Sequence, residues 1–196
     1  MIVAFKPPFL LVHDDGNNQD TLQARVNGYL QLNQNKYPAQ AIHRIDYETS
    51  GLVLFCKHPF FQAYCDKNME EHHIKKEYIA LVQGHTNYKN KKIISNIARD
   101  RHNAKKMIIH PNGKESVSIF NTLKNYKDCS LIQVTILTGR KHQIRVQCAS
   151  LNHPILNDPL YGGKKIDNTG LLLQSHHIQF NDVNITCPQE KRFIRK

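Results

Sequence analysis

The stretch His43-Arg44-Ile45-Asp46-Tyr47-Glu48-Thr49-Ser50-Gly51 leads directly into the apolar run Leu52-Val53-Leu54-Phe55-Cys56. A continuous apolar run of this length, followed by His58-Pro59, predicts a buried strand. The polar residues in front of it then lie on a loop that a rigid sheet holds in place, where reactive groups are often found. An ordinary turn, in which Asp46 or Thr49 bonds the backbone, fits the same residues.

A second polar stretch, Thr138-Gly139-Arg140-Lys141-His142-Gln143-Ile144-Arg145, lies between a predicted strand at 131–137 and a predicted helix at 143–151. Backbone N–H groups at the start of a helix favour anions, and nearby Arg and Lys side chains strengthen the effect. The stretch therefore predicts a phosphate or carboxylate site. A solvated basic turn has the same composition and stays open as an alternative.

The remaining patterns predict several short strands and a few helices. A helix capped by Asp20 carries Leu22, Val26 and Leu30 on one face, and Pro59 suits the first turn of another helix. Asn112-Gly113 is typical of a hairpin turn. Further strands are expected at 2–5, 10–12, 76–82, 116–120 and 178–185, and a turn at 14–18. Many strands with interspersed helices predict an α+β domain with a largely antiparallel sheet.

Composition limits the class of protein. The chain has 196 residues, with 27 Lys and Arg against 16 Asp and Glu, so the net charge is +11. Such an excess predicts an anionic partner, either nucleic acid or anionic lipid. The longest apolar runs fall far short of the ~20 residues of a spanning helix. Lys6-Pro7-Pro8 interrupts the first apolar stretch, so no signal peptide is expected.

Cysteine and histidine usage points to a reduced, cytoplasmic protein without a metal. The five cysteines are odd in number and none has C-x-x-C spacing, so neither a disulfide framework nor a zinc ribbon is expected. Among the twelve histidines, the densest clusters, His72-His73 and His176-His177, lack the i, i+4 spacing of helical zinc sites. We expect no metal and no cofactor.

Four motifs occur in order along the chain: H-R-x-D-x-x-T-S-G, K-x-Y-x-A-x-V-x-G, T-G-R-x-H-Q-I-R-V and H-P-I-L-x-D-P-L-Y-G-G, at residues 43–51, 76–84, 138–146 and 153–163. Together with the opening Lys6-Pro7-Pro8-Phe9-Leu10-Leu11-Val12-His13, they resemble the RluA-type pseudouridine synthases, which isomerise uridine to pseudouridine within RNA. The resemblance runs from about residue 2 to about residue 186.

The resemblance implies a fold and a domain organisation. It implies a single catalytic domain over residues 1–196, with a mixed but largely antiparallel sheet, flanking helices and loops, and an active-site cleft across the sheet. Because the first motif begins almost at Met1, we expect a short form without the N-terminal S4-type RNA-binding domain of many members. The basic end of the chain, residues 188–196, is expected to form a tail, and the sequence leaves open whether this tail is ordered.

The resemblance also implies catalytic roles. Asp46 matches the essential aspartate, Tyr78 the tyrosine that stacks on the uracil and helps proton transfer at C5, and Arg145 the arginine that pairs with the aspartate. The chemistry agrees with these roles, since a carboxylate can attack as a nucleophile or take a proton from the sugar. Either task requires the ionised form, which a neighbouring guanidinium favours. The isomerisation is redox-neutral and needs no cofactor.

A further set of residues is assigned to substrate and RNA binding. Arg44 matches an arginine that enters the RNA beside the flipped nucleotide, and Leu172 belongs to a run that forms an apolar wall of the uracil pocket. The segment 89–114 holds eight basic residues and one acidic residue, and is expected to contribute to the phosphate-binding surface. The full set is Arg44, Thr49, Arg140, His142, Gln143, Leu172, Lys91, Lys92, Lys105 and Lys106.

The chain departs from the family pattern at a few positions. Ile45 replaces Leu, and Tyr47 stands where Lys is frequent. Asn152 and Asn157 replace glycines, but Asn tolerates left-handed backbone angles well, so the turns are expected to survive. Gln174-Ser175 replaces His-Ala and changes the pocket wall. None of these departures removes a proposed catalytic group.

The leading hypothesis is an RNA pseudouridine synthase that acts on uridines of structured ribosomal or transfer RNA as a cytoplasmic monomer. No membrane or DNA partner is expected. One alternative is a non-catalytic RNA-binding or ribosome-assembly protein on the same fold, although Asp46, Tyr78 and Arg145 are all present. Another, a metal-dependent nuclease, lacks clustered carboxylates. The sequence leaves open the target uridine and the choice between nucleophilic attack and sugar deprotonation.

Overall fold

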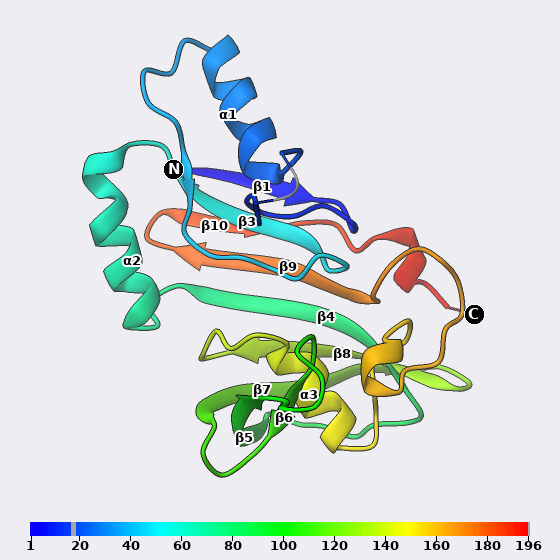
Figure 1. The fold of residues 1–196 in the computed structure, drawn as a ribbon. Coiled ribbons are helices and arrows are strands. Elements are labelled where there is room, and N and C mark those ends of the chain that lie inside the picture. Colours follow the sequence, from blue (N-terminus) through cyan, green and yellow to red (C-terminus); the bar gives the residue numbers. More distant parts are fainter. Residues whose placement is uncertain (17–18, 196) are drawn as a thin grey trace.

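A mixed ten-stranded sheet runs through the computed structural model, which describes residues 1–16 and 19–195 (Figure 1). The strands are β1 (Ile2–Lys6), β2 (Gln40–Ala41), β3 (Ser50–Cys56), β4 (Lys75–Gln83), β5 (Lys91–Arg99), β6 (Met107–Ile109), β7 (Lys114–Asn125), β8 (Cys129–Ile136), β9 (Leu173–Phe180) and β10 (Val183–Thr186). The α-helices are α1 (Leu22–Leu32), α2 (Gln62–Glu70) and α3 (Gln143–Ser150), with 3₁₀ turns η1 (Pro59–Phe61), η2 (Pro159–Tyr161) and η3 (Lys191–Phe193).

The strand order is β1-β3-β9-β4-β8-β7-β5-β6, with β10 paired to β9 and β2 to β3. Every pairing is antiparallel except that of β3 with β9. This parallel pairing is short, because it joins only Ser50 to Gln174 and Gly51 to Ser175. The α+β class and the largely antiparallel mixed sheet predicted from the sequence are therefore confirmed.

Strand β3 is buried along its whole length. Its side chains alternate between two hydrophobic clusters, as successive residues of a strand must. Val53 and Phe55 pack in the main core with residues of β4 and β8, whereas Leu52 and Leu54 pack in a second core that α2 covers. Apolar partners on both faces explain why the sequence of β3 is continuously apolar.

Helix α1 forms where the sequence predicts it, and its apolar face buries Leu22, Val26 and Leu30. The cap residue differs from the prediction. The Thr21 hydroxyl, and not Asp20, accepts the hydrogen bond from the N–H of Ala24. Asp20 lies one residue too early for this role and instead forms an exposed ion pair with Arg25 at 2.8 Å.

The turn at Asn112-Gly113 is present, but it does not join a simple hairpin. It connects β6 to β7, which lie on opposite sides of β5. The chain passes so close to β5 that a Cβ atom on Gly113 would lie 2.6 Å from the backbone of Ile97. A glycine is needed here for close approach, and a local turn signal cannot show which strands pair.

One other expectation is wrong: residues 10–12 form only an isolated bridge at Leu11 and no strand.

The order of the basic C-terminal segment, which the sequence leaves open, is visible in the structure. Phe193 is fully buried, and Arg192 donates to Ser50 Oγ at 2.7 Å and to Leu171 O at 3.2 Å. The predicted turn at 14–18 includes Asn17 and Asn18, and the tail includes Lys196; these three residues lie outside the described part.

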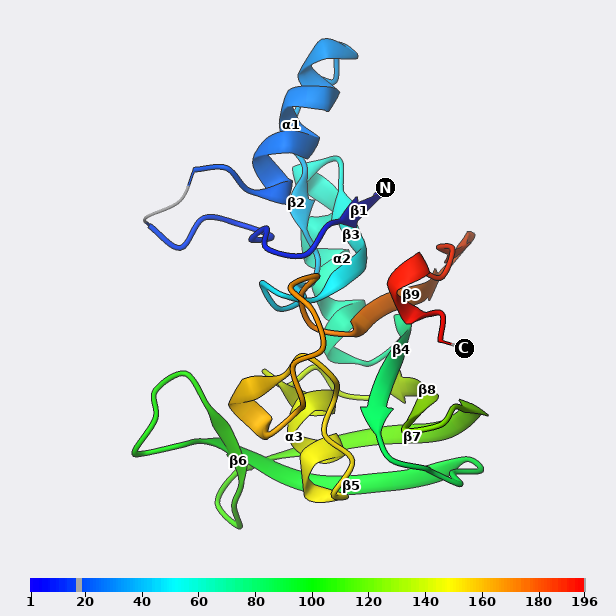
Figure 2. The ribbon, with the colours of Figure 1, turned by 90° about the vertical axis from the view of Figure 1, so that its right-hand side faces the viewer.

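In the view of Figure 2, α3 and β6 lie to the left of β4, β5 runs below it, and η3, in red, lies above it. Helix α3 contacts β5, β6 and η2. The second polar stretch, residues 138–145, connects the end of β8 to α3 and forms the first turn of that helix. The loop before β3, which contains the first polar stretch, lies on the side of the sheet toward this connection (Figure 1). Within residues 1–16 and 19–195, no helix has both the length and the hydrophobicity required to cross a membrane.

The junction of β3 with β9 leads to a prediction about stability. Gly51 has φ +115°, and a Cβ atom there would lie 2.2 Å from Ser175 O. Gly51→Ala should therefore lower the free energy of unfolding by roughly 2–4 kcal/mol, measured by urea denaturation. The matched control is Gly28→Ala in α1, where a Cβ atom meets nothing within 4 Å. This substitution should raise the free energy of unfolding by about 0.5–1 kcal/mol. Equal stability of Gly51→Ala and the wild type would contradict this description of the junction.

Candidate active site

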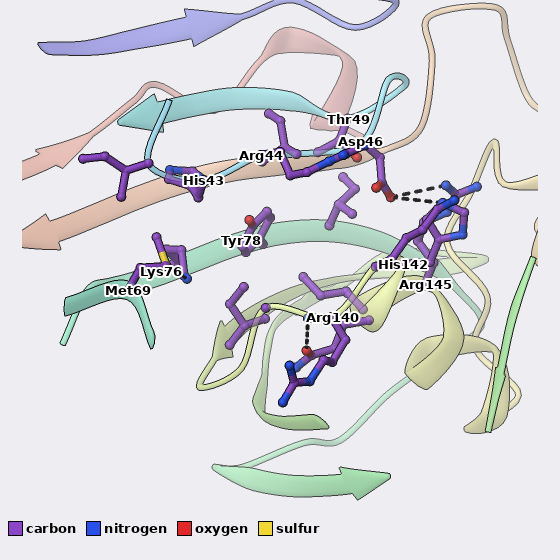
Figure 3. Close-up of a pocket in the computed structure, with 18 of the residues that line it drawn as sticks. His43, Arg44, Asp46, Thr49, Met69, Lys76, Tyr78, Arg140, His142 and Arg145 are labelled. Carbon is purple, nitrogen blue, oxygen red and sulfur yellow. Dashed lines mark hydrogen bonds and ion pairs between the residues drawn. The ribbon is translucent and has the colours of Figure 1, made fainter. Parts of the chain in front are cut away.

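A pocket of about 700 Å³ opens between the loop before β3, strand β4 and the start of α3. Figure 3 shows the side chains that line it, including Asp46, Tyr78 and Arg145. Its volume falls within the range of about 300–1,000 Å³ typical of small-molecule sites. The two polar stretches of the sequence meet here, although about 90 residues separate them.

Arg145 on α3 is held by a buried ion pair with Asp158. Its Nε and Nη2 donate to the two carboxylate oxygens of Asp158, each at 2.8 Å. The side chain of Arg145 is 4% exposed and that of Asp158 is fully buried. The guanidinium carbon also lies 5.2 Å from the ring centre of Tyr161. A two-point bond of this kind fixes the plane and the direction of the guanidinium.

The third nitrogen of Arg145 faces two other carboxylates. Nη1 donates to Asp46 Oδ2 at 3.3 Å and lies 3.6 Å from Glu48 Oε2. Burial acts to lower the pKa of Arg145, but the hydrogen bonds and charge of Asp158, together with the charges of Asp46 and Glu48, outweigh it and raise the pKa above its ordinary value. Arg145 thus remains a cation, and it places a positive charge beside Asp46.

A buried lysine, Lys6, holds the loop that carries Asp46. Lys6 Nζ donates to the carbonyl oxygens of Pro7, Leu10 and Tyr47 at 2.9, 2.8 and 3.1 Å. The N–H of Phe9 donates to the same oxygen of Tyr47 at 2.8 Å. These bonds fix the residue that follows Asp46, and they leave the side chain of Asp46 25% exposed to the pocket.

His142 lies beside Arg145 and faces the same oxygen of Asp46 (Figure 3). Its Nε2 lies 3.9 Å from Asp46 Oδ2, and its Nδ1 shares a hydrogen bond of 2.8 Å with the Tyr161 hydroxyl. Burial lowers the pKa of His142 to about 4, against the charge of Asp46, which raises it. The imidazole is therefore neutral at pH 7, and Arg145 is the cation that faces Asp46.

Gln143 organises the turn before α3. Its Oε1 accepts from Thr138 Oγ1 at 2.8 Å and from the N–H of Arg140 at 3.0 Å, and its Nε2 donates to Val117 O and Ser118 Oγ at 3.1 and 2.8 Å. The side-chain amide predicted to bind substrate is thus engaged within the protein. It holds Arg140 and Lys141, which are exposed at the pocket.

Tyr78 on β4 forms the middle of the pocket wall (Figure 3). The residue is 6% exposed. Burial raises the pKa of its hydroxyl above the ordinary value, although a hydrogen bond with Ser175 opposes the shift. The predicted apolar run 171–173 lines the pocket through Leu173 on the neighbouring strand β9, whereas Leu172, the residue predicted, is fully buried in the main core.

The residues predicted to bind RNA separate into two groups. Arg44, Thr49, Arg140, His142 and Gln143 line the pocket. The four lysines do not. Lys105 and Lys106 lie in the loop after β5, and Lys106 Nζ lies 5.6 Å from the ring centre of Tyr161. Lys91 and Lys92 lie at the start of β5. Because a strand of nine residues spans roughly 27 Å, they are far from the end of β5 that lies near Tyr161 and the pocket.

Several residues of the site were missed in the sequence. Asp158 lies in the fourth motif, but nothing in its neighbourhood marked it as the partner of Arg145. Tyr161, in the same motif, accepts a hydrogen bond from the N–H of Met107 at 2.9 Å and so ties the β5–β6 loop to the pocket. Lys6 and Lys76 are buried, and a lysine carries no local sign of burial in a sequence. Within residues 1–16 and 19–195, no cluster of three or more His, Cys, Asp or Glu side chains suits a metal ion.

Comparison with known proteins identifies relatives over most of the chain. A family model described as RNA pseudouridylate synthase matches residues 1–150. An uncharacterised RNA pseudouridine synthase of Bacillus subtilis, YhcT, is 35% identical over 166 residues, which cover 83% of this chain and 55% of the relative. The ribosomal large subunit pseudouridine synthase C of Buchnera aphidicola is 39% identical over 168 residues, which cover 78% of this chain and 53% of the relative. The chain thus spans about half the length of these relatives.

Two solved human structures have the same fold. Human RNA pseudouridylate synthase domain containing 1 aligns with a TM-score of 0.77 at 22% identity and covers 98% of this chain and 81% of its own. Human RNA pseudouridylate synthase domain containing 4 aligns with a TM-score of 0.79 at 20% identity, and the alignment covers 97% of this chain and 86% of the human chain. At these identities the likeness concerns the fold.

The buried pair predicts unequal effects for the carboxylates around Arg145. Asp158→Ala leaves a buried guanidinium without its main partner and should lower the free energy of unfolding by about 3–5 kcal/mol. Glu48→Ala removes a carboxylate that is 44% exposed and should lower the free energy of unfolding by less than about 1 kcal/mol. Urea denaturation of the two variants measures both values. Similar losses in both would show that Asp158 is not the residue that holds Arg145.

Proposed function

Because the chain belongs to the RNA pseudouridylate synthase family, we propose that it converts uridine in RNA to pseudouridine and that Asp46 is its catalytic carboxylate. The supporting observation is the approach of Arg145 Nη1 to Asp46 Oδ2 at 3.3 Å, in a pocket whose middle is formed by Tyr78. A carboxylate, a cation that favours its charged form and an aromatic face for the base are groups that this isomerisation can use.

The reaction breaks the N1–C1′ bond of uridine and forms a C5–C1′ bond. In one route, an oxygen of Asp46 attacks C1′ and the electron pair of the broken bond goes to N1. In the other, Asp46 removes the proton from C2′ and the same pair goes to N1 as a C1′–C2′ double bond forms. Both routes need a carboxylate that is charged and held in one place, and Arg145 supplies both conditions. After the base rotates, C5 bonds to C1′. In the first route the bond between Asp46 and C1′ breaks and its electron pair returns to the carboxylate, and in the second route a proton returns to C2′. C5 then loses its proton and N1 gains one.

The burial of Tyr78 refines its proposed role. Because the pKa of its hydroxyl is raised, the hydroxyl keeps its proton at neutral pH. A protonated phenol can offer a stacking face to the base, but it is a poor acceptor for the proton that leaves C5. We therefore assign Tyr78 to stacking and orientation of the uracil rather than to proton transfer.

Access to the pocket requires that the target nucleotide leave the stack. A base within an RNA helix cannot reach a carboxylate enclosed in this way, so enzymes that act on bases extrude them first. Arg44, Arg140 and Lys141 are exposed where they line the pocket, and guanidinium and ammonium groups suit phosphates. The net charge of +11 adds attraction that does not depend on sequence.

The names of relatives favour one class of RNA. Relatives from Buchnera aphidicola and Escherichia coli are named ribosomal large subunit pseudouridine synthases C and D. We propose large-subunit ribosomal RNA as the first substrate to test, ahead of transfer RNA, which the names do not mention.

The proposed activity predicts a specific loss. Wild-type protein should release tritium from an unmodified transcript of large-subunit ribosomal RNA that carries tritium at C5 of uridine. Asp46→Asn should reduce release to background, because the amide can neither attack C1′ nor accept a proton. Asp66→Asn, on the exposed face of α2, is the matched control and should release tritium at the wild-type rate.

The same assay separates the alternatives. Equal release by Asp46→Asn and the wild type would mean that another residue is catalytic. RNA binding without release by the wild type, with transfer RNA also tested, would favour the non-catalytic RNA-binding protein.

The distances from the pocket predict unequal effects of the basic residues. Replacement of Lys105 and Lys106 with Gln should weaken RNA binding and reduce the slope of log affinity against log salt by roughly 0.7–0.9 per lost phosphate contact. The matched pair Lys91→Gln and Lys92→Gln removes the same charge from the far end of β5 and should change the slope less. Filter binding at several salt concentrations measures both. A larger effect of the second pair would place the RNA along the far end of β5.

A further inference from the structure

Lys76 is a buried lysine in the pocket wall, on β4 two residues before Tyr78, so both side chains lie on the same face of the strand. The residue is 6% exposed. Its Nζ donates to Met69 Sδ at 2.9 Å. Within residues 1–16 and 19–195, that thioether is its one side-chain partner, and no carboxylate lies within ion-pair distance.

The other buried cations show that this environment is unusual. Lys6 Nζ donates to three backbone carbonyls, at 2.8 to 3.1 Å, and Arg145 pairs with carboxylates. The neighbouring Lys75 is half exposed and bonds Glu77 at 2.8 Å. Lys76 has neither carbonyls nor a carboxylate, and a thioether is only a weak acceptor.

A buried ammonium group without an anion destabilises the protein that carries it. Burial lowers the pKa of Lys76 to about 8, so most molecules still carry the charge at pH 7. His43, which lies close by, does not neutralise it: burial and the charge of Lys76 lower the pKa of His43 to about 3, and its Nε2 accepts a hydrogen bond from the N–H of Leu54. The charge is therefore available to a ligand.

The position of Lys76 in the pocket indicates which part of a ligand it meets. Figure 3 shows Lys76 and Met69 at one end, Asp46 and Arg145 at the other, and Tyr78 between them. If the sugar of the target nucleotide lies at Asp46 and the base lies on Tyr78, the far edge of the base points toward Lys76. That edge of uracil carries carbonyl oxygens.

We propose that Lys76 Nζ donates a hydrogen bond to a carbonyl oxygen of the target uracil and stabilises the negative charge that the detached base carries. The inference rests on the proposed function. When the N1–C1′ bond breaks, its electron pair goes to N1 and delocalises onto O2 and O4. When C5 bonds to C1′, this negative charge disappears, and the later loss of the C5 proton is balanced by a proton gained at N1. Lys76 keeps its proton throughout, so it acts by charge alone.

A single-turnover experiment tests this role. Enzyme in excess is mixed with the large-subunit ribosomal RNA transcript that carries tritium at C5 of uridine, and release is followed at rising enzyme concentrations. Lys76→Met keeps the length of the side chain and removes the charge. It should lower the rate at saturating enzyme on the order of 100-fold, while the enzyme concentration for half-maximal rate stays within about twofold because ground-state binding is little affected. The matched control, Lys75→Met, should leave both values unchanged.

Two further measurements separate this role from a structural one. Lys76→Met should unfold at the same or a higher temperature than the wild type, because a buried charge without a partner is replaced by an apolar side chain. Lys76→Ala should regain at least about tenfold in rate when ethylammonium is added, since a small cation can enter the space that the side chain leaves.

The outcomes are distinct. An undiminished rate for Lys76→Met would overturn the proposal, as would a normal saturating rate with weakened binding, which would make Lys76 a phosphate contact. A lower unfolding temperature without rescue by ethylammonium would also overturn it in favour of a structural role. No release by the wild type would remove the proposed function and this inference with it, whereas release by the wild type and by Lys76→Met alike removes this inference alone.

Discussion

The buried ion pair between Arg145 and Asp158 is the constraint on which the site depends. Both charges are almost completely removed from water, which is costly unless each is well paired. The two-point bond satisfies this condition and fixes the guanidinium between α3 and the segment before η2. Its third nitrogen then points to Asp46, on a loop that Lys6 and the parallel junction of β3 with β9 hold in place. Chain segments about 100 residues apart thus meet in one geometry.

The site contains three buried cations with different surroundings. Lys6 is satisfied by backbone carbonyls and serves the loop. Arg145 is satisfied by carboxylates and serves Asp46. Lys76 has only a thioether. The first two have strong hydrogen-bond acceptors that offset the cost of burying their charge, whereas the third has only a weak one. Natural proteins tolerate such local losses where function requires them.

The sequence was informative where the signal is local. The apolar run at 52–56, the helix face of α1 and the strand at 76–82 correspond to observed elements. Asn152 and Asn157 do adopt left-handed angles, with φ of 62° and 63°, as their substitution for glycine predicted. The resemblance to a family also named Asp46 and Arg145 as partners, and the structure brings them into contact.

The failures concern information that is not local. The turn at Asn112-Gly113 could not show that β6 and β7 lie on opposite sides of β5. All three leucines of the run 171–173 pack in the main core, but among them only Leu173 also lines the pocket, and the sequence has no sign that distinguishes it from Leu172. The basic composition of the C-terminus concealed Phe193, which anchors it in the core. Asp158 and Lys76 became visible only when burial and partners were known.

We infer that Asp158, through Arg145, holds Asp46 in the position that the proposed catalysis requires. The most direct measurement is the single-turnover rate of tritium release by Asp158→Asn, at a temperature well below its unfolding transition and with enzyme saturating. Since the amide keeps the shape of the carboxylate but not its charge, we expect a folded protein that binds RNA normally and reacts at least about tenfold more slowly. A folded variant with the wild-type rate would contradict the claim.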